Sequence, residues 1–445
     1  MNELTAVLDD KIEKALLLLK KKGIRDYEIF ASSGDIIRAE AEDGAMKNLE
    51  RAAEAGVSIR ILTDGSMGFA CGRDADEKLV DSAIISARYQ FSDEHNTIPS
   101  AEAKYMNTDI FDNDIAGLTA EECLERAKII ESSALKYDER VKQARKATFA
   151  RTLSYVRIVN SAGIDVKGEA TYCSASVMVM AGSGEEMQSG YDFSISHNLK
   201  DIELEKTGLT ASKNAVSMLG ARHIVTCRMP VLFDNTTTAD ILETISGSFV
   251  GENIIKGKSL LKDRLGELYF SPCITLLDDP LEKNSINSFA FDGEGVASRK
   301  NILIEEGRVA SFVYDSYWGK VAGRSSTGNS IRGSYRSSPV LGVRYLKLEP
   351  GGAMLGQLAG LKQVLKVTDI MGMHTVDPIS GEFSVGVNGM LIEKGEDSYP
   401  VREAAIAGNL YSMLGHVVHV GDDIRSFGSV KTPSILIEDM DISSQ

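Results

Sequence analysis

The sequence predicts an α+β fold made of two parts. Residues 1–220 are expected to form a domain with a mixed sheet and long helices, and residues 221–445 a mainly antiparallel β domain. A length of 445 residues suggests two or three domains. Long amphipathic segments alternate with strand-like segments in the first half. Beyond residues 220–227, short strands separated by turns dominate.

The first half begins with an amphipathic helix over 4–22, which ends in lysines followed by Gly23. Further helices are expected over 76–89, 119–137 and 201–219. Thr119 and Glu122 form a capping box at the start of the helix over 119–137. The polar segment 92–116 is a surface connection and marks a sub-boundary. Strands are expected over 27–31, 36–41, 57–62, 67–71, 142–149, 154–160 and 171–180.

The second half is expected to contain many short strands and two short helices. The turns at 304–307 and 392–395 share the pattern Ile-Glu-x-Gly. They indicate one turn geometry used twice, because no repeat period of about 20–50 residues is visible. Strands are expected over 230–233, 273–277, 301–304, 309–314, 344–348, 383–387 and 389–392, and helices over 236–249 and 358–365.

Composition argues against several classes of partner. The formal net charge of −15 and a pI near 5.0 argue against a broad electrostatic surface for DNA or anionic membranes. Five widely spaced cysteines, without a Cys-x-x-Cys pair, are typical of a reducing compartment. The N-terminal segment lacks a basic region before an apolar core, and its apolar run over 15–19 is too short to span a membrane. We therefore expect a cytoplasmic protein with no nucleic-acid or membrane partner.

The segment 289–332 has the pattern of a functional loop region. It contains a Gly-rich corner over 291–296, a β-hairpin over 301–314 and a polar loop over 324–329. Glycine permits positive φ and close approach to the backbone. Two such corners around a hairpin suggest a loop site held by a scaffold. Two tight turns at a sheet edge would give the same pattern.

Three runs in this segment resemble a known family. They are F-D-x-E-G-V from Phe291, L-I-E-x-G from Leu303 and S-T-G-N-x-x-R ending at Arg332. They are similar to the C-terminal domain of the PmbA/TldD family, also called modulators of DNA gyrase. The segments 56–69 and 380–395 resemble further family elements, so the resemblance spans both halves of the chain. It implies zinc peptidase activity by a two-subunit complex.

The chain departs from the family pattern where zinc would bind. The resemblance implies His-Glu-x-x-x-His on the helix after the first C-terminal strand, and a cysteine near the C-terminus as the third ligand. Aligned on Glu243 and Gly251, Leu242 stands at the first histidine position and Gly247 at the second. No cysteine follows Cys273. The helical spacing of apolar residues here predicts that Leu242 belongs to the core.

The resemblance therefore implies the PmbA (TldE) branch, which lacks zinc ligands and pairs with a zinc-bearing, TldD-type subunit. We expect no catalytic residue, no metal and no cofactor in this chain, which would be inactive alone, and zinc in the partner. The role of this chain would be to hold unfolded peptides. The candidate peptide-binding residues are Asp292, Glu294, Asn329 and Arg332. Arg332 could meet a carboxylate of the substrate or of the partner subunit or be a solvated turn residue.

Two other functions stay open. His416 and His419, with Asp422 beyond them, would share one face of a helix and form a relocated metal site. On a strand the two histidines would point to opposite faces. Alternatively, the chain is a homodimeric scaffold or binding protein without peptidase activity. The sequence contains no P-loop, nucleophile-elbow or dinucleotide glycine motif.

Overall fold

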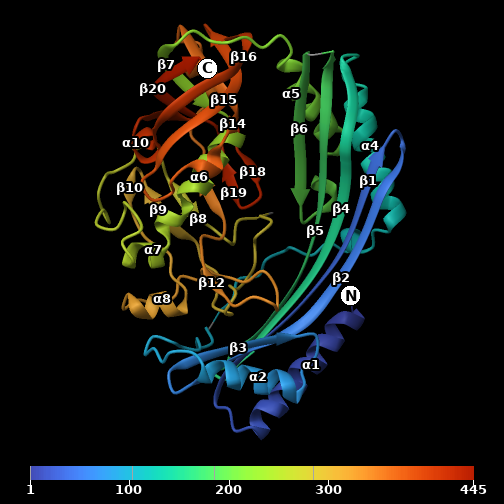
Figure 1. The fold of residues 1–445 in the computed structure, drawn as a ribbon, viewed down its shortest axis with the longest axis vertical. Coiled ribbons are helices and arrows are strands. Elements are labelled where there is room, and N and C mark those ends of the chain that lie inside the picture. The colour runs from blue at the N-terminus through green and yellow to red at the C-terminus, as the bar shows by residue number, and fades with distance from the viewer. Residues whose placement is uncertain (1, 103, 185, 284, 445) are drawn as a thin grey trace.

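The computed structural model describes residues 2–102, 104–184, 186–283 and 285–444. Its N-terminal half is built on a six-stranded sheet with the strand order β3-β2-β1-β4-β5-β6 (Figure 1). Two three-stranded meanders meet along β1 and β4, so neighbouring strands are antiparallel. The predicted α+β class is confirmed, but this sheet is antiparallel where a mixed sheet was expected. Its strands are β1 (Asp26–Glu42), β2 (Ala45–Thr63), β3 (Ser66–Gly72), β4 (Val141–Asn160), β5 (Asp165–Ser183) and β6 (Glu186–Ser196).

The strands of this sheet are longer than predicted. The predicted strands 27–31 and 36–41 are both parts of β1, because Ser33 and Gly34 between them pair with Ala55 and Glu54 of β2. The predicted strands over 142–149 and 154–160 likewise belong to β4. Polar residues and a glycine stay in a strand when neighbouring strands on both sides satisfy their backbone groups.

Helices cover one face of the sheet (Figure 1). Ile29 and Ile37 of β1 face these helices and are buried against them. Since side chains alternate along a strand, Glu28 and Phe30 face the C-terminal half. The predicted capping box begins α4. The helices of this half are α1 (Asn2–Lys21), α2 (Glu77–Arg88), α3 (Asn113–Ala116), α4 (Ala120–Leu135) and α5 (Leu204–Ser217).

The C-terminal half contains two six-stranded sheets and a two-stranded sheet. Most pairings are antiparallel; β7 with β14 and β13 with β19 are parallel. One sheet consists of β16 (Glu396–Asn409), β15 (Glu382–Glu393), β14 (Gln363–Met371), β7 (Cys227–Phe233), β20 (Ile435–Ser444) and β17 (Val417–Val420). The other consists of β10 (Arg308–Val309), β9 (Asn301–Glu305), β8 (Leu276–Asp278), β13 (Leu346–Leu348), β19 (Val430–Thr432) and β18 (Arg425–Phe427). The small sheet pairs β11 (Ser330–Ile331) with β12 (Val340–Leu341).

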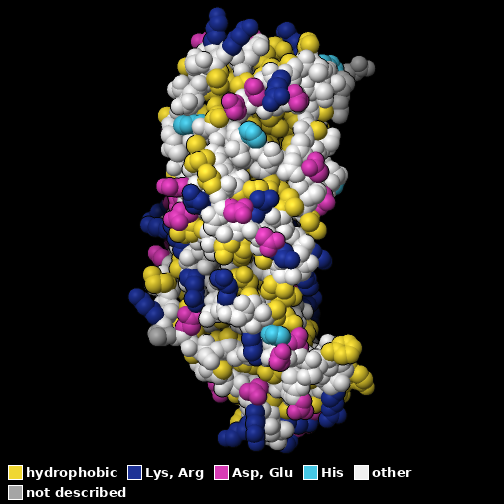
Figure 2. Space-filling model, turned by 90° about the vertical axis from the view of Figure 1, so that its left-hand side faces the viewer, with side chains coloured by type: hydrophobic (Ala, Val, Ile, Leu, Met, Phe, Trp, Pro, Cys, Tyr) yellow, Lys and Arg dark blue, Asp and Glu magenta, His cyan; other side chains and the backbone are white. Residues whose placement is uncertain are grey.

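Short helices connect these sheets. They are α6 (Asn235–Ser246), α7 (Gly251–Ile255), α8 (Ser316–Val321), α9 (Met354–Leu358) and α10 (Leu410–Gly415). Among the described residues, no helix is long and apolar enough to cross a membrane. On the face shown in Figure 2, acidic and basic side chains are interspersed.

The helix predicted over 358–365 is wrong. α9 ends at Leu358, and β14 begins at Gln363. Val364 and Leu365 are both buried, in different apolar clusters on the two faces of the sheet. A strand that is buried on both faces is apolar without alternation, and periodicity alone cannot distinguish it from a short helix.

The two hairpin turns that share a sequence pattern also share a geometry. Glu306 and Gly307 have φ of 45° and 79°, and Lys394 and Gly395 have φ of 53° and 85°. Positive φ at both central residues is required by the type I′ turn that suits tight hairpins. The prediction of one turn geometry used twice is confirmed.

Candidate functional site

The Gly-rich corner over 291–296 is shaped by its own aspartate. Asp292 Oδ1 accepts hydrogen bonds from the backbone N–H groups of Glu294 (2.9 Å) and Val296 (3.0 Å). Oδ2 accepts one from the Ser330 N–H (3.0 Å). Gly295 has φ of 80°, which glycine adopts without strain. Asp292 is therefore buried inside the loop that it organises.

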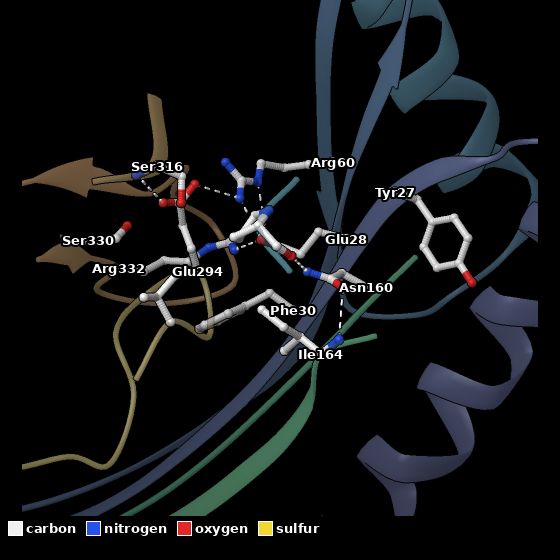
Figure 3. A network of polar contacts seen from close by, with 12 residues as sticks. Tyr27, Glu28, Phe30, Arg60, Asn160, Ile164, Glu294, Ser316, Ser330 and Arg332 are labelled. Atoms are coloured by element: carbon white, nitrogen blue, oxygen red, sulfur yellow. Dashed lines mark hydrogen bonds and ion pairs between the residues drawn. The ribbon is translucent and has the colours of Figure 1, made fainter. Parts of the chain in front are cut away.

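Four charged side chains meet between the N-terminal sheet and the C-terminal loops (Figure 3). Glu28 on β1 accepts hydrogen bonds from Arg60 Nε at 3.0 Å and Nη2 at 2.5 Å, and from Arg332 Nη1 at 2.6 Å. Arg60 Nη2 also donates to Glu294 Oε1 at 3.0 Å. Glu28 and Arg60 are paired across β1 and β2 and so share the face opposite the helices. We call these four residues the junction ion cluster.

Further hydrogen bonds fix the cluster on both sides. Arg332 donates from Nη2 to Ser58 Oγ (2.9 Å) and from Nε to the Ser337 carbonyl (2.9 Å). Its guanidinium carbon lies 4.1 Å from the centre of the Phe30 ring, close enough for a cation–π interaction. Glu294 Oε2 accepts the Ser316 N–H at the start of α8 (3.1 Å). The cluster therefore ties two strands of the N-terminal sheet to several C-terminal loops.

Asn329 fixes the polar loop to the core of the C-terminal half. Its Nδ2 donates to Asp278 Oδ2 of β8 at 2.5 Å and to the Gly342 carbonyl at 3.1 Å. Its Oδ1 accepts a hydrogen bond from Thr327 Oγ1 at 2.7 Å. Asn329 has no exposed surface, so its amide forms hydrogen bonds within the protein and holds the loop in place.

Burial and ion pairing shift the pKa values of the paired side chains in opposite directions. Burial raises the pKa of Glu28, but Arg60 and Arg332 outweigh it and hold that pKa below its usual value. Burial lowers the pKa of Arg332 to about 10, so its guanidinium stays protonated at neutral pH. Burial and the Glu294 carboxylate together raise the pKa of Asp292 to about 7. Charges in the junction ion cluster are thus paired, whereas Asp292 is close to its titration point.

Two sequence elements that carried the family resemblance meet in this cluster. Arg60 comes from 56–69, and Glu294 and Arg332 come from 291–332. Glu28 and Arg60 were not predicted as site residues. Arg60 stands between Ile59 and Ile61, and a charge inside an apolar strand is the signal that would have indicated a buried partner.

The four predicted peptide-binding residues lie near one another but inside the chain's own contacts. Asp292, Glu294 and Asn329 are at most 4% exposed, and the Arg332 side chain is 1% exposed. Direct contact between these side chains and a peptide stays a prediction.

A cavity of about 270 Å³ lies beside the junction ion cluster. We call it the junction cavity. Asp292 and Arg332 both line it, so two of the predicted residues border a space that can hold a small group. Its walls include Phe30, Ser154 and Tyr172 of the N-terminal sheet and Phe289, Ser330 and Arg344 of the C-terminal half.

The positions at which the family would bind zinc do not fit a metal in this chain. Leu242 of α6 is 1% exposed and packs in the C-terminal core, as predicted. Gly247 lies in a 3-10 turn after α6, and Glu243 is exposed. Neither a leucine nor a glycine side chain offers a donor atom to zinc.

The histidines considered for a relocated metal site bond separately. His416 ends α10, and its Nδ1 lies 2.7 Å from the Ser412 carbonyl. His419 is in β17, and its Nε2 lies 3.0 Å from the Gly352 carbonyl. Within the described part of the chain, no group of three or more His, Cys, Asp or Glu side chains is arranged to hold a metal ion.

The fold and site define a class: an α+β protein in which a long antiparallel sheet, covered by helices on one face, is joined on its other face to a β-rich domain. Three family models match in this order. They describe PmbA/TldA metallopeptidase domain 1 (residues 27–87), the central domain (113–219) and the C-terminal domain (226–444). The chain belongs to the PmbA/TldD metallopeptidase family, as the sequence motifs indicated.

Relatives match over nearly the whole chain. Metalloprotease PmbA of Escherichia coli O157:H7 is 26% identical over 450 residues, covering 99% of this chain and 96% of that protein. A PmbA homologue of Haemophilus influenzae is 27% identical, covering 89% of this chain and 88% of that protein. Among solved structures, one described as a modulator of a DNA gyrase from Thermotoga maritima is 26% identical, with a TM-score of 0.90 over 98% of this chain and 100% of that chain. TldE of Thermococcus kodakarensis shares the fold, with 24% identity and a TM-score of 0.89 over 97% of this chain and 100% of that chain.

Proposed function

We propose that this chain is the non-catalytic, peptide-holding subunit of a two-component zinc metallopeptidase. It would act in the cytoplasm with a TldD-type paralogue that carries zinc, and the substrates would be unfolded peptides. The observation that carries the proposal is the burial of Leu242 in the core at the first histidine position of the family pattern. A family member without donor atoms there needs another chain to supply the metal.

The geometry also supports a holding role. The N-terminal sheet and the C-terminal loops are joined by buried, paired charges, which gives the junction cavity fixed walls. Binding surfaces held on a rigid scaffold lose less free energy to ordering when a flexible peptide binds. The five cysteines are free thiols, which fits the proposed cytoplasmic location.

The decisive experiment is a peptidase assay on an unstructured peptide with zinc present. The chain alone, a paralogue with His-Glu-x-x-x-His alone, and their mixture are compared. We expect activity only in the mixture or strongly raised there, and well below one zinc per chain in the purified chain. Replacing the glutamate of the paralogue's motif by glutamine should abolish activity, whereas the matched Glu243→Gln change in this chain should leave it intact.

Other outcomes would contradict the proposal. Chelator-sensitive activity of this chain alone would point to a relocated metal at His416 and His419. Equal activity of the paralogue with and without this chain would remove the holding role. A stable homodimer that neither binds the paralogue nor changes its activity would favour the scaffold alternative.

A further inference from the structure

The junction cavity has the size and walls of a site for one side chain. Its volume of about 270 Å³ lies just below the range of about 300–1,000 Å³ that holds drug-sized ligands. Phe30, Tyr172, Phe289 and Phe291 contribute aromatic surface to the walls. The rings of Phe289 and Phe291 pack edge to face, with centroids 4.8 Å apart, so this part of the wall is already ordered.

The charged groups in the walls already have partners. Arg332 is bound to Glu28. Arg344 donates to Ser298 Oγ at 2.5 Å and to the carbonyls of Gly328 and Phe291 at 3.2 Å. The Asp292 oxygens accept three backbone N–H groups. A cationic ligand would lose its hydration without gaining a free carboxylate, which disfavours it.

One polar group in the wall lacks a partner. Ser330 is 1% exposed, and its Oγ is one of four buried side-chain atoms without a hydrogen-bond partner among the described residues. Its backbone is fixed, because its N–H donates to Asp292 Oδ2 and its carbonyl accepts the Gly293 N–H at 2.8 Å. The accessible surface of its Oγ is below 1 Å², so this hydroxyl is not open to a ligand in the cavity.

We propose that the junction cavity binds one apolar side chain of an extended peptide. The inference rests on the proposed function in taking a peptide as the ligand. It goes further by naming the site and the preferred residue class. The cavity is lined by both halves of the chain, so occupancy would also stabilise their junction.

The test measures binding of N-acetyl-phenylalanine amide to the full chain by saturation-transfer NMR, with N-acetyl-lysine amide as the charged comparison. We expect the phenylalanine compound to bind at least about tenfold more tightly, because the wall offers aromatic contact and no free carboxylate. Ser154→Leu fills the cavity and should abolish binding. Ser174→Leu is the matched control, because Ser174 lies on the same face of β5 as the cavity residue Tyr172 but outside the cavity.

Equal binding of both compounds, no binding, or unchanged binding in Ser154→Leu would overturn the proposal. This binding test uses no paralogue. A negative binding result therefore does not contradict the proposed subunit role, and a negative peptidase assay of the mixture does not contradict side-chain binding in the cavity.

Discussion

Glu28 has no exposed surface, yet it remains ionised because two arginines share it. A buried carboxylate without a partner would take up a proton, since burial disfavours the charged form. The arginines come from different halves of the chain, Arg60 from β2 and Arg332 from the loop after β11. The Glu28 carboxylate is therefore the shared counterion of two arginines from different halves of the chain.

Removing this charge should be costly. Glu28→Gln leaves Arg60 and Arg332 without their shared carboxylate, and we expect a loss of about 3–5 kcal/mol in the free energy of unfolding. Thermal denaturation followed by circular dichroism measures the change. The control is Glu50→Gln, which breaks an ion pair with Arg38 whose side chains are about half exposed; it should shift stability by less than about 0.5 kcal/mol. Equal shifts in the two variants would show that the cluster contributes no more than a surface pair.

Asp240 offers a pH-dependent test. Burial and the charges of Glu243, Asp234 and Asp369 raise its pKa to about 6. Between the unfolded pKa of about 3.9 and this value, the folded state binds more protons, so the contribution of Asp240 to stability is lost as pH rises. Asp240→Asn should stabilise the chain at pH 7.5 by on the order of 1 kcal/mol, discounted for partial exposure, and by about half as much at pH 5.

The measurement compares thermal midpoints of Asp240→Asn and wild type at both pH values. Asp138 supplies a control of opposite sign, because Arg140 holds its pKa down at about 2. Asp138→Asn should therefore destabilise at pH 7.5. A pH-independent difference for Asp240→Asn would contradict the raised pKa.

At the scale of elements, the tight hairpins are set by their glycines. Gly307 has φ of 79°, and an added Cβ would lie 2.4 Å from the Phe270 carbonyl oxygen. Gly44, in the hairpin between β1 and β2, has φ of 71° and nothing within 4 Å of the same position. Gly44→Ala should cost about 1–2 kcal/mol from backbone strain alone, and Gly307→Ala clearly more. Urea denaturation of the two variants measures the difference, and equal losses would show that the Phe270 contact relaxes freely.

Local signals predicted the elements whose ends are marked in the sequence. The capping box at Thr119 and the Ile-Glu-x-Gly turns are examples, since one side chain or one positive φ determines them. Strand lengths could not be predicted in the same way. Ser33 and Gly34 remain in β1 because β2 and β4 flank them, and neighbours distant in sequence leave no mark in a local pattern.

At the scale of the whole molecule, the family motifs indicated the segments that form the junction, but they did not predict which residues contact each other there. The resemblance indicated 56–69 and 291–332 separately, and the fold brings Arg60 to Glu294 across the two halves. Glu28 belongs to neither motif. Its role depends on the register of β1 against β2, which pairs it with Arg60 and is fixed by the burial of neighbouring apolar residues on the opposite face.

This junction should make the two halves unfold together. Interfaces between domains commonly permit independent motion, but here buried charges and an apolar cluster containing Phe30, Phe291 and Tyr335 join them. We expect a single calorimetric unfolding transition. Ile59→Ala in the N-terminal core and Leu242→Ala in the C-terminal core should lower its midpoint equally, because each removes about 2–5 kcal/mol from the free energy of unfolding.

Arg332→Gln should separate this transition into two, because it removes the guanidinium that links the C-terminal loops to Glu28 and Ser58. In that background, Ile59→Ala should move only the N-terminal transition and Leu242→Ala only the C-terminal one. Scanning calorimetry of wild type and the five variants measures these transitions. Two transitions already present in wild type, each moved by one core substitution, would show that the halves are independent and that the ion cluster does not couple them.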